Sequence, residues 1–155
     1  LFCKLKNYEV SRVTGFGRNA LLPLRPDLND ISLAIIEFED GSIAKVTSNY
    51  CSVTPHHHKV SVYGSEGSFE QTFGLARYFW GRDNADRCLD TEEKFDKKLG
   101  KDSLLRDFVD SLLTGDPMHI NATEVFKVMA VSICVEESLA EGTTLPVDFS
   151  GFGIS

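Results

Sequence analysis

The first half of the chain carries the period-two alternation that is typical of β-strands. Apolar and β-branched side chains alternate with polar ones in short runs, and turn residues separate the runs. Asp40-Gly41 is a typical hairpin turn between two of these runs. Strands are expected at residues 9–16, 31–39, 42–52, 57–63 and 68–73. Residues 74–98 indicate further short strands and loops without a clear period.

Beyond residue 100 the apolar residues recur at helical spacing, which predicts two helices. The apolar stripe of the first consists of Leu104, Leu105, Phe108, Val109, Leu112 and Leu113. Asn121 and Glu124 have the spacing of a capping box for the second helix, and Gly142 is placed to end it. The main face of this second helix is expected to consist of Ala122, Val125, Phe126, Met129 and Ile133. Further valines widen that face, so we expect the helix to be buried on more than one side.

Strands followed by helices are the order of an α+β fold rather than of a doubly wound sheet. We therefore predict an open, mainly antiparallel sheet with two C-terminal helices packed on one face. A last edge strand is expected over residues 145–149. A chain of 155 residues buries roughly 70% of the surface that its unfolded form would expose, which is enough for one core. One domain over residues 1–155 is the simplest organisation.

The predicted strand over residues 31–39 is apolar on both sides. Its two sides carry Ile31, Leu33 and Ile35 on the one hand and Ala34, Ile36 and Phe38 on the other. A large apolar sheet face is seldom left in water, so we expect the open face to meet another subunit or domain. Coverage of that face by long loops is the alternative.

The charge balance argues against several classes of partner. The net charge is −7 and no basic run is interleaved with aromatic residues, which argues against nucleic acid. No apolar stretch approaches the roughly 20 residues of a membrane helix. The four cysteines lie far apart without a C-x-x-C motif, as is typical of reduced thiols in a cytoplasmic protein.

Two short motifs contain residue types that are found in ligand-binding sites. Gly15-Phe16-Gly17 lacks the third glycine and the helix that a dinucleotide site needs, so we assign it no cofactor-binding role. If His56, His57 and His58 open a strand, His56 and His58 project to one face and could chelate a metal. No second group of ligands is spaced to complete such a site, which favours polar residues near an interface or a substrate cleft. We assign no metal ligand.

Tyr78, Trp80 and Arg82 supply aromatic faces and a polar group of the kind that a sugar ring would need. Together with the three histidines they form the set of candidate substrate-facing residues, and an exposed sheet edge or a subunit contact is the structural alternative. Arg18 and Asn19, after the first strand, are further candidates. No acid–base pair and no Ser-His-Asp set is recognisable by spacing, so we assign no catalytic residue.

An ordered set of motifs runs through the chain from about residue 8 to residue 149. The set consists of residues 34–44, 60–69, 108–111 and 115–117, with Ser132, Ser138, Gly142 and Pro146-Val147. This set resembles the C-terminal domain of the Gfo/Idh/MocA oxidoreductases, named after glucose–fructose oxidoreductase and inositol dehydrogenase. In that family an N-terminal Rossmann domain holds NAD or NADP. The C-terminal sheet supplies part of the substrate pocket, and its outer face builds dimers or tetramers. The resemblance thus implies a homo-oligomer through the open sheet face.

The resemblance implies a parent enzyme that oxidises or reduces a sugar, polyol or related hydroxy compound, with a Rossmann domain of the same polypeptide as partner. The family's catalytic lysine lies in Glu-Lys-Pro and its catalytic histidine in Asp-x-x-x-His, and neither motif occurs here. We therefore expect the chain to be a part of such an enzyme that binds no nicotinamide and shows no turnover by itself. A stand-alone binding or scaffold module of the same fold is the alternative, and a small metal-dependent enzyme that uses the histidines is a third interpretation.

Overall fold

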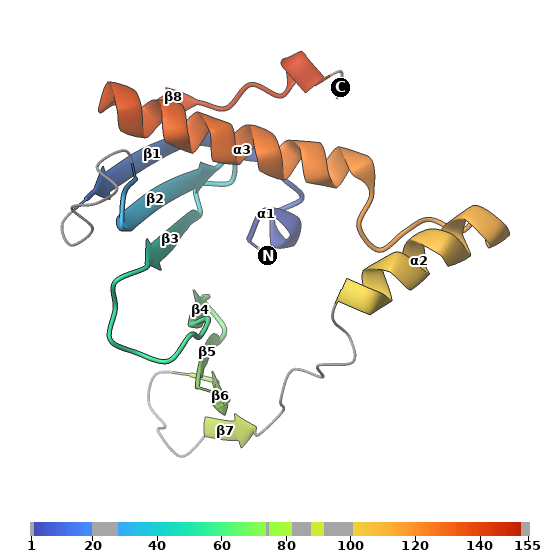
Figure 1. Cartoon of the computed structure of the whole chain (residues 1–155). Coiled ribbons are helices and arrows are strands. Elements are labelled where there is room, and N and C mark those ends of the chain that lie inside the picture. Colours follow the sequence, from blue (N-terminus) through green and yellow to red (C-terminus); the bar gives the residue numbers. More distant parts are fainter. Residues whose placement is uncertain (1, 20–27, 74, 82–87, 92–100, 153–155) are drawn as a thin grey trace. The chain divides into compact units, whose positions relative to one another are not determined.

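The protein divides into two compact units (Figure 1). The first comprises Leu1–Val53 and Pro117–Ser155, and the second comprises Thr54–Asp116. The computed structural model describes residues 2–19, 28–73, 75–81, 88–91 and 101–152. The described strands pair in antiparallel sheets and two long helices belong to the C-terminal part of the chain, so the predicted α+β class is confirmed. One domain over residues 1–155 stays a prediction.

The first unit is built on a four-stranded sheet in the order β3-β2-β1-β8. Its strands are β1 (Val10–Arg18), β2 (Ile31–Phe38), β3 (Ile43–Asn49) and β8 (Leu145–Pro146). The predicted hairpin between β2 and β3 is confirmed, because Gly41 adopts a φ of 81° and Asp40 accepts a hydrogen bond from the backbone N–H of Ser42 at 3.0 Å. The expected last strand is shorter than predicted and pairs with β1 at the edge of the sheet.

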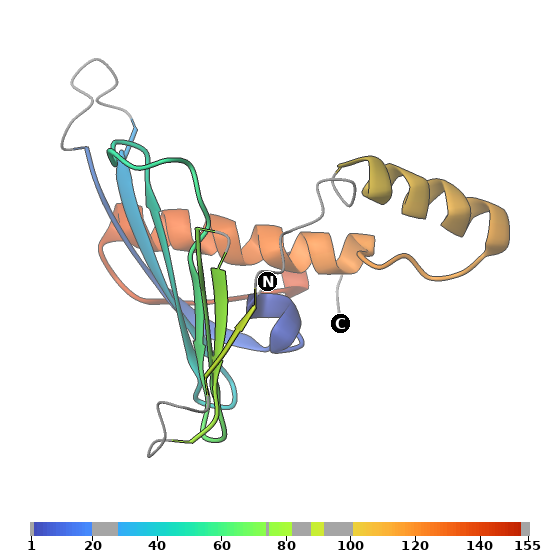
Figure 2. The ribbon, with the colours of Figure 1, turned by 90° about the horizontal axis from the view of Figure 1, so that it is seen from below.

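Helix α3 (Ala122–Glu141) crosses one face of this sheet (Figure 2). It begins with the predicted capping box at Asn121 and ends at Gly142, whose φ of 69° lies in the left-handed region. The helix approaches β1 so closely that a Cβ atom at Gly15 would lie 2.4 Å from the carbonyl oxygen of Val135. The core beneath it consists of Cys3, Val10, Val13, Ile36, Phe38, Ala44, Val131 and Cys134.

A fully buried serine joins α3 to strand β1. The hydroxyl of Ser138 accepts a hydrogen bond from the backbone N–H of Gly15 at 2.9 Å and donates one to the carbonyl oxygen of Thr143 at 2.5 Å. Strand β8 pairs with β1 only at Leu145 and Pro146. Beyond these two residues β8 offers no acceptor to β1. The hydroxyl of Ser138 takes that place and accepts the hydrogen bond of the buried N–H of Gly15.

The buried face of α3 differs from the predicted one. The buried residues of the helix are Ala130, Val131, Cys134 and Ser138. The prediction that Val125, Phe126, Met129 and Ile133 belong to the main buried face is wrong for this unit, because these four side chains are 44–47% exposed. Close approach to the glycines of β1 selects the side of the helix that carries small side chains, and turns the larger ones outward.

The second unit has a four-stranded sheet of its own, in the order β4-β5-β6-β7. Its strands are β4 (Val60–Tyr63), β5 (Ser68–Thr72), β6 (Leu75–Phe79) and β7 (Cys88–Thr91). The third strand of the predicted meander starts at Val60 rather than at residue 57, and it pairs with β5 instead of β3. Pro55 has no N–H to donate to a sheet, which accounts for the irregular backbone before β4. The strands thus form two sheets instead of one.

Helix α2 (Lys101–Thr114) belongs to the second unit and confirms the first predicted helix. It ends at Gly115, which has a φ of 79°. The predicted apolar stripe is exposed at Leu104, Leu105, Phe108, Val109, Leu112 and Leu113. Two short elements complete the described chain, namely α1 (Phe2–Leu5) and the 3-10 helix η2 (Ser150–Phe152). Within the described residues, none of the helices has the length and hydropathy that crossing a bilayer requires.

Candidate functional site

Three aromatic side chains of the second unit lie together, and we call Phe69, Tyr78 and Trp80 the aromatic platform. Phe69 of β5 is the direct cross-strand partner of Tyr78 of β6, and their ring centroids are 4.9 Å apart. Trp80 follows two residues after Tyr78, so it projects to the same side, and the two rings stack at 5.9 Å with an interplanar angle of 17°. The pairing of Phe69 with Tyr78 thus follows from the strand register, and Trp80 extends the row beyond the end of β6.

A shallow hollow of about 230 Å³ lies against the platform. Its walls include Val62, Gly67 and the platform residues. A Cβ atom at Gly67 would lie 3.6 Å from Cδ1 of Trp80 and 3.0 Å from the backbone of Phe79, so the glycine leaves space for the indole beside the turn. Small-molecule sites usually enclose about 300–1,000 Å³. The hollow is therefore smaller than a complete small-molecule pocket.

The three histidines lie in the irregular segment before β4. His56 and His58 contact each other edge to face with ring centroids 5.2 Å apart, whereas His57 stacks on Phe73 at 4.2 Å. Nδ1 of His57 lies 2.9 Å from the carbonyl oxygen of Pro55. Among the described residues, no group of three or more histidine, cysteine or carboxylate side chains is placed to hold a metal ion.

The structure brings the predicted substrate-facing residues together in two separate groups. Tyr78 joins Trp80, and His56 joins His58, but the ring contacts within the described part of the chain do not connect the two groups. Arg82 lies outside the described residues. Arg18 ends β1 and Asn19 follows it, so both belong to the first unit.

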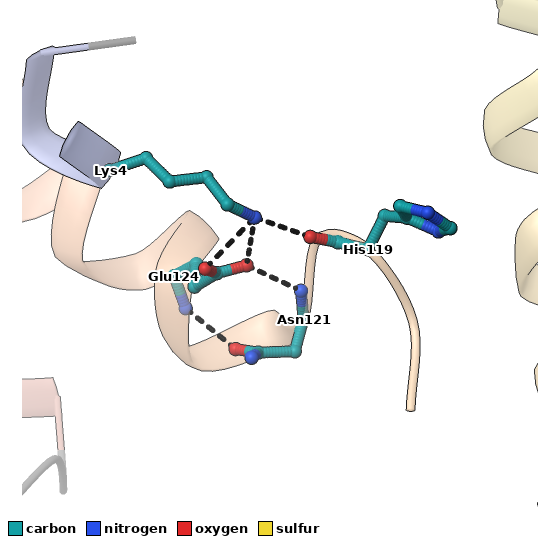
Figure 3. A network of polar contacts seen from close by, with 4 residues as sticks. All are labelled: Lys4, His119, Asn121 and Glu124. Carbon is teal, nitrogen blue, oxygen red and sulfur yellow. Dashed lines mark hydrogen bonds and ion pairs between the residues drawn. The ribbon is translucent and has the colours of Figure 1, made fainter. Parts of the chain in front are cut away.

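A polar network joins α1 to the N-terminal turn of α3 within the first unit (Figure 3). Nζ of Lys4 in α1 lies 3.2 Å from Oε1 of Glu124 and also donates a hydrogen bond to the carbonyl oxygen of His119. Glu124 in turn accepts a hydrogen bond from the backbone N–H of Asn121 at 3.1 Å. Lys4 thereby ties the first described helix to the N-terminal turn of α3. The side chain of Lys4 is 52% exposed, so this ion pair adds little to the stability of the fold and mainly fixes an orientation.

The network shifts two ionisation equilibria. The pKa of Glu124 lies below its usual value, mainly because the backbone N–H of Asn121 donates to the carboxylate, with Lys4 acting in the same direction. The pKa of Tyr8 lies above its usual value, mainly because of burial, and the neighbouring Glu124 carboxylate adds to this. Tyr8 reaches this position through a left-handed backbone, with a φ of 61°. Glu124 is therefore a carboxylate at neutral pH that interacts with Asn121, Lys4 and Tyr8.

An apolar groove lies beside this network within the first unit. Its volume is about 550 Å³, which falls in the range of small-molecule sites. The walls are formed by Lys4, Leu5, Tyr8, Ile120, Glu124, Val125, Val128 and Met129. We call this feature the α1–α3 groove. Six of its eight wall residues are apolar or aromatic, and the two charged ones pair with each other, so the groove fits an apolar occupant better than a charged ligand.

The sequence of residues 6–149 matches the Gfo/Idh/MocA family described as "Oxidoreductase family, C-terminal alpha/beta domain". The match covers most of the chain. The chain belongs to this family. The resemblance expected from the ordered motifs is therefore confirmed. A search among curated proteins finds no match.

Solved structures with the family fold include levoglucosan dehydrogenase in complex with NADH and levoglucosan, at 17% identity and a TM-score of 0.74. UDP-N-acetylglucosamine 3-dehydrogenase from Acidithiobacillus ferrooxidans matches at 14% identity and a TM-score of 0.74. The matches cover 90% of this chain but only 45% and 43% of those two chains. The chain thus spans less than half the length of these structures, and such low identities show the fold alone.

Within the family fold, the contacts between α1 and α3 were not predicted from the sequence. The capping box was recognisable because its two residues are three apart. The contact between Lys4 and Glu124 joins residues separated by 120 positions, and no local pattern reports such a pair. The buried role of Ser138 was also missed, since a serine in an apolar helix gives no sign of which backbone group it will bond.

Proposed function

We propose that the chain is the substrate-binding and oligomerisation domain of an NAD- or NADP-dependent oxidoreductase acting on a sugar, polyol or related hydroxy compound. The match of residues 6–149 to the C-terminal domain of the oxidoreductase family carries this proposal. Relatives of the same fold include dehydrogenases of levoglucosan and of a nucleotide sugar, each more than twice as long as the matched part. The proposal places the protein in the cytoplasm.

In this proposal the nicotinamide cofactor is held by a Rossmann domain of the same polypeptide. The Gly-x-Gly motif of this chain does not fit a cofactor, because Gly15 and Gly17 lie in β1 against α3. A Cβ atom at Gly17 would lie 2.6 Å from Cδ1 of Leu139, so the space that a pyrophosphate would need is filled by the helix. We expect the chain alone to bind no NAD or NADP and to show no turnover. Saturable binding at micromolar concentration would contradict this expectation.

The aromatic platform is the part of the chain that we assign to the sugar. Stacked Tyr78 and Trp80 present ring faces, and Trp80 is 48% exposed, so a ligand can reach the indole. The hollow beside them is too small to enclose a substrate, so the remaining walls come from elsewhere. His56, His57, His58 and Arg82 remain substrate-facing candidates, as hydrogen-bonding groups around such a ring.

Steady-state kinetics of the longer polypeptide that carries this domain test the assignment. Replacing Trp80 by alanine is expected to raise KM for the sugar about two- to tenfold, the factor that corresponds to the loss of one aromatic stacking contact. Tyr63→Ala is the matched control, because Tyr63 is an exposed aromatic residue of β4 that projects to the other face of the same sheet. Equal KM values for both variants and the unchanged enzyme would contradict a role of the platform in sugar binding.

The open face of the first sheet is the surface that we assign to self-association. The strand register places Phe16, Leu33 and Thr47 side by side, with Thr14, Ile35 and Lys45 in the next row on the same face. Phe16 is 55% exposed, and both faces of β2 are apolar, as the sequence predicted. Phe16→Glu is expected to lower the oligomeric mass measured by light scattering. An unchanged mass would assign self-association to another surface.

A further inference from the structure

The turn between β2 and β3 contains the one Asp-Gly pair of the sequence, Asp40-Gly41. In such a pair the backbone nitrogen of the glycine can attack the carboxyl carbon of the aspartate side chain, because no side chain on the glycine hinders the approach. A C–N bond forms, one water molecule leaves, and a cyclic succinimide results. Water then adds to either of its carbonyl carbons, which gives back aspartate or gives isoaspartate. The isomerisation therefore needs no reagent other than water.

Isoaspartate at this position would damage the hairpin. It carries the chain through its side-chain carboxyl group and so lengthens the backbone by one carbon atom. The turn is closed by a hydrogen bond from the backbone N–H of Phe38 to the carbonyl oxygen of Ser42 at 3.0 Å. A longer backbone between these partners disturbs the register in which β2 and β3 pair. The side chain of Asp40 is 49% exposed, so water reaches the site at which this damage would occur.

Both oxygens of the Asp40 carboxylate are held by donors. Oδ1 accepts hydrogen bonds from the backbone N–H of Ser42 at 3.0 Å and from its hydroxyl at 2.6 Å, and Oδ2 forms an ion pair with Nζ of Lys6. The hydrogen bond from Lys6, followed by those from Ser42, holds the pKa of Asp40 well below its usual range. Succinimide formation proceeds through the neutral carboxylic acid, because water leaves far more easily than oxide. The donors therefore keep the side chain in its unreactive form.

Lys6 reaches the turn because the backbone places the segment before β1 beside it. The backbone N–H of Glu39 donates to the carbonyl oxygen of Glu9 at 2.9 Å, and Val10 pairs with Phe38. The backbone N–H of Glu9 in turn donates to the carbonyl oxygen of Lys6 at 3.1 Å. All of these residues belong to the first unit. Main-chain hydrogen bonds thus position Lys6 for its contact with the turn.

The attacking nitrogen is held as well. The backbone N–H of Gly41 donates to the carbonyl oxygen of Phe38 at 2.9 Å, so this hydrogen bond must break before the nitrogen can lose its proton and attack. We propose that Asp40 is a latent isomerisation site and that Lys6 and Ser42 protect it from conversion to isoaspartate. The proposal does not depend on the proposed function, since it concerns only the hairpin and the segment before β1.

Accumulation of isoaspartate at residue 40 during incubation at neutral pH measures the protection, and peptide mapping by liquid chromatography and mass spectrometry separates the two isomers. Lys6→Met removes the charge and keeps an unbranched side chain. We expect this variant to isomerise about tenfold faster, since each pKa unit restored to Asp40 raises the fraction of neutral acid tenfold. Lys6→Arg keeps the charge and is expected to remain as slow as the unchanged protein. Ser42→Ala removes only the hydroxyl donor, so a smaller increase is expected.

Lys45→Met is the matched control, because Lys45 lies on β3 opposite Ile35 rather than a carboxylate, and it should leave the rate unchanged. The unchanged protein in concentrated urea gives the rate without the fold, which is expected to exceed the rate of every folded variant. Equal rates for Lys6→Met and the unchanged protein would overturn the proposal. So would equal increases for Lys6→Met and Lys6→Arg, which would assign the effect to a loosened turn rather than to the lost charge.

Discussion

Replacing Ser138 by alanine removes the hydroxyl that joins β1, α3 and the segment before β8. The backbone N–H of Gly15 then loses its hydrogen-bond acceptor in a fully buried position. An unsatisfied buried donor costs about 1–3 kcal/mol. The carbonyl oxygen of Thr143 also loses a donor, but Thr143 is exposed and water replaces the hydroxyl there. The expected loss is therefore about 2 kcal/mol of the free energy of unfolding, within the range for one such group.

Thermal unfolding measured by calorimetry provides the assay. In a chain of this size 1 kcal/mol shifts Tm by about 2–4 °C, so Ser138→Ala is expected to lower Tm by about 4–8 °C. Ser132→Ala is the matched control on the same helix, because its exposed hydroxyl donates only to the carbonyl oxygen of Val128 one turn earlier. It should change stability by less than about 0.5 kcal/mol. Equal Tm values for the two variants would refute the bridging role of Ser138.

Two further predictions concern the contacts of α3. Gly15→Ala places a Cβ atom 2.4 Å from the carbonyl oxygen of Val135, so we expect it to lower the free energy of unfolding, measured with urea, by about 1–3 kcal/mol. Gly151→Ala is the control, because its Cβ atom meets open space and should leave the free energy of unfolding unchanged. Because the pKa of Glu124 is lowered in the fold, its stabilisation is present above the reference value of 4.5 and is lost as the pH falls through the lower, folded value. Glu124→Gln should therefore be less stable than the unchanged protein at neutral pH and equally stable in strong acid. A difference in Tm that is independent of pH would contradict this.

Local patterns allowed much of the fold to be predicted. Asp40-Gly41 predicted the hairpin because few residue pairs other than those with glycine accept the backbone of such a turn. Asn121 and Gly142 predicted both ends of α3, since capping depends on side chains within one helical turn. The apolar residues on both sides of β2 likewise predicted a sheet with two apolar faces. These features depend on neighbours in sequence.

Tertiary contacts decided the features that the sequence did not predict. The wide apolar surface of α3 did not reveal which side faces β1, because that choice depends on Gly15 and on the helix residues small enough to approach it. Alternation alone predicted that His57 belongs to a strand. In the structure His57 lies in the irregular segment that follows Pro55, and its ring stacks on Phe73. Tyr78 and Trp80 of the aromatic platform were predicted from their residue types, whereas Phe69 was not predicted. The stacking geometry of the platform required the register of β5 and β6.

The coding sequence upstream of the Leu1 codon is the measurement that tests the central claim most directly. Our account predicts an open frame that continues through an Asp-x-x-x-His motif, a Glu-Lys-Pro motif and a Gly-x-Gly-x-x-Gly strand–helix unit, in that order when read backwards from Leu1. A frame that starts close to Leu1 would contradict the assignment to half of an oxidoreductase. In that case the aromatic platform and the α1–α3 groove would belong to a binding module without a nicotinamide partner.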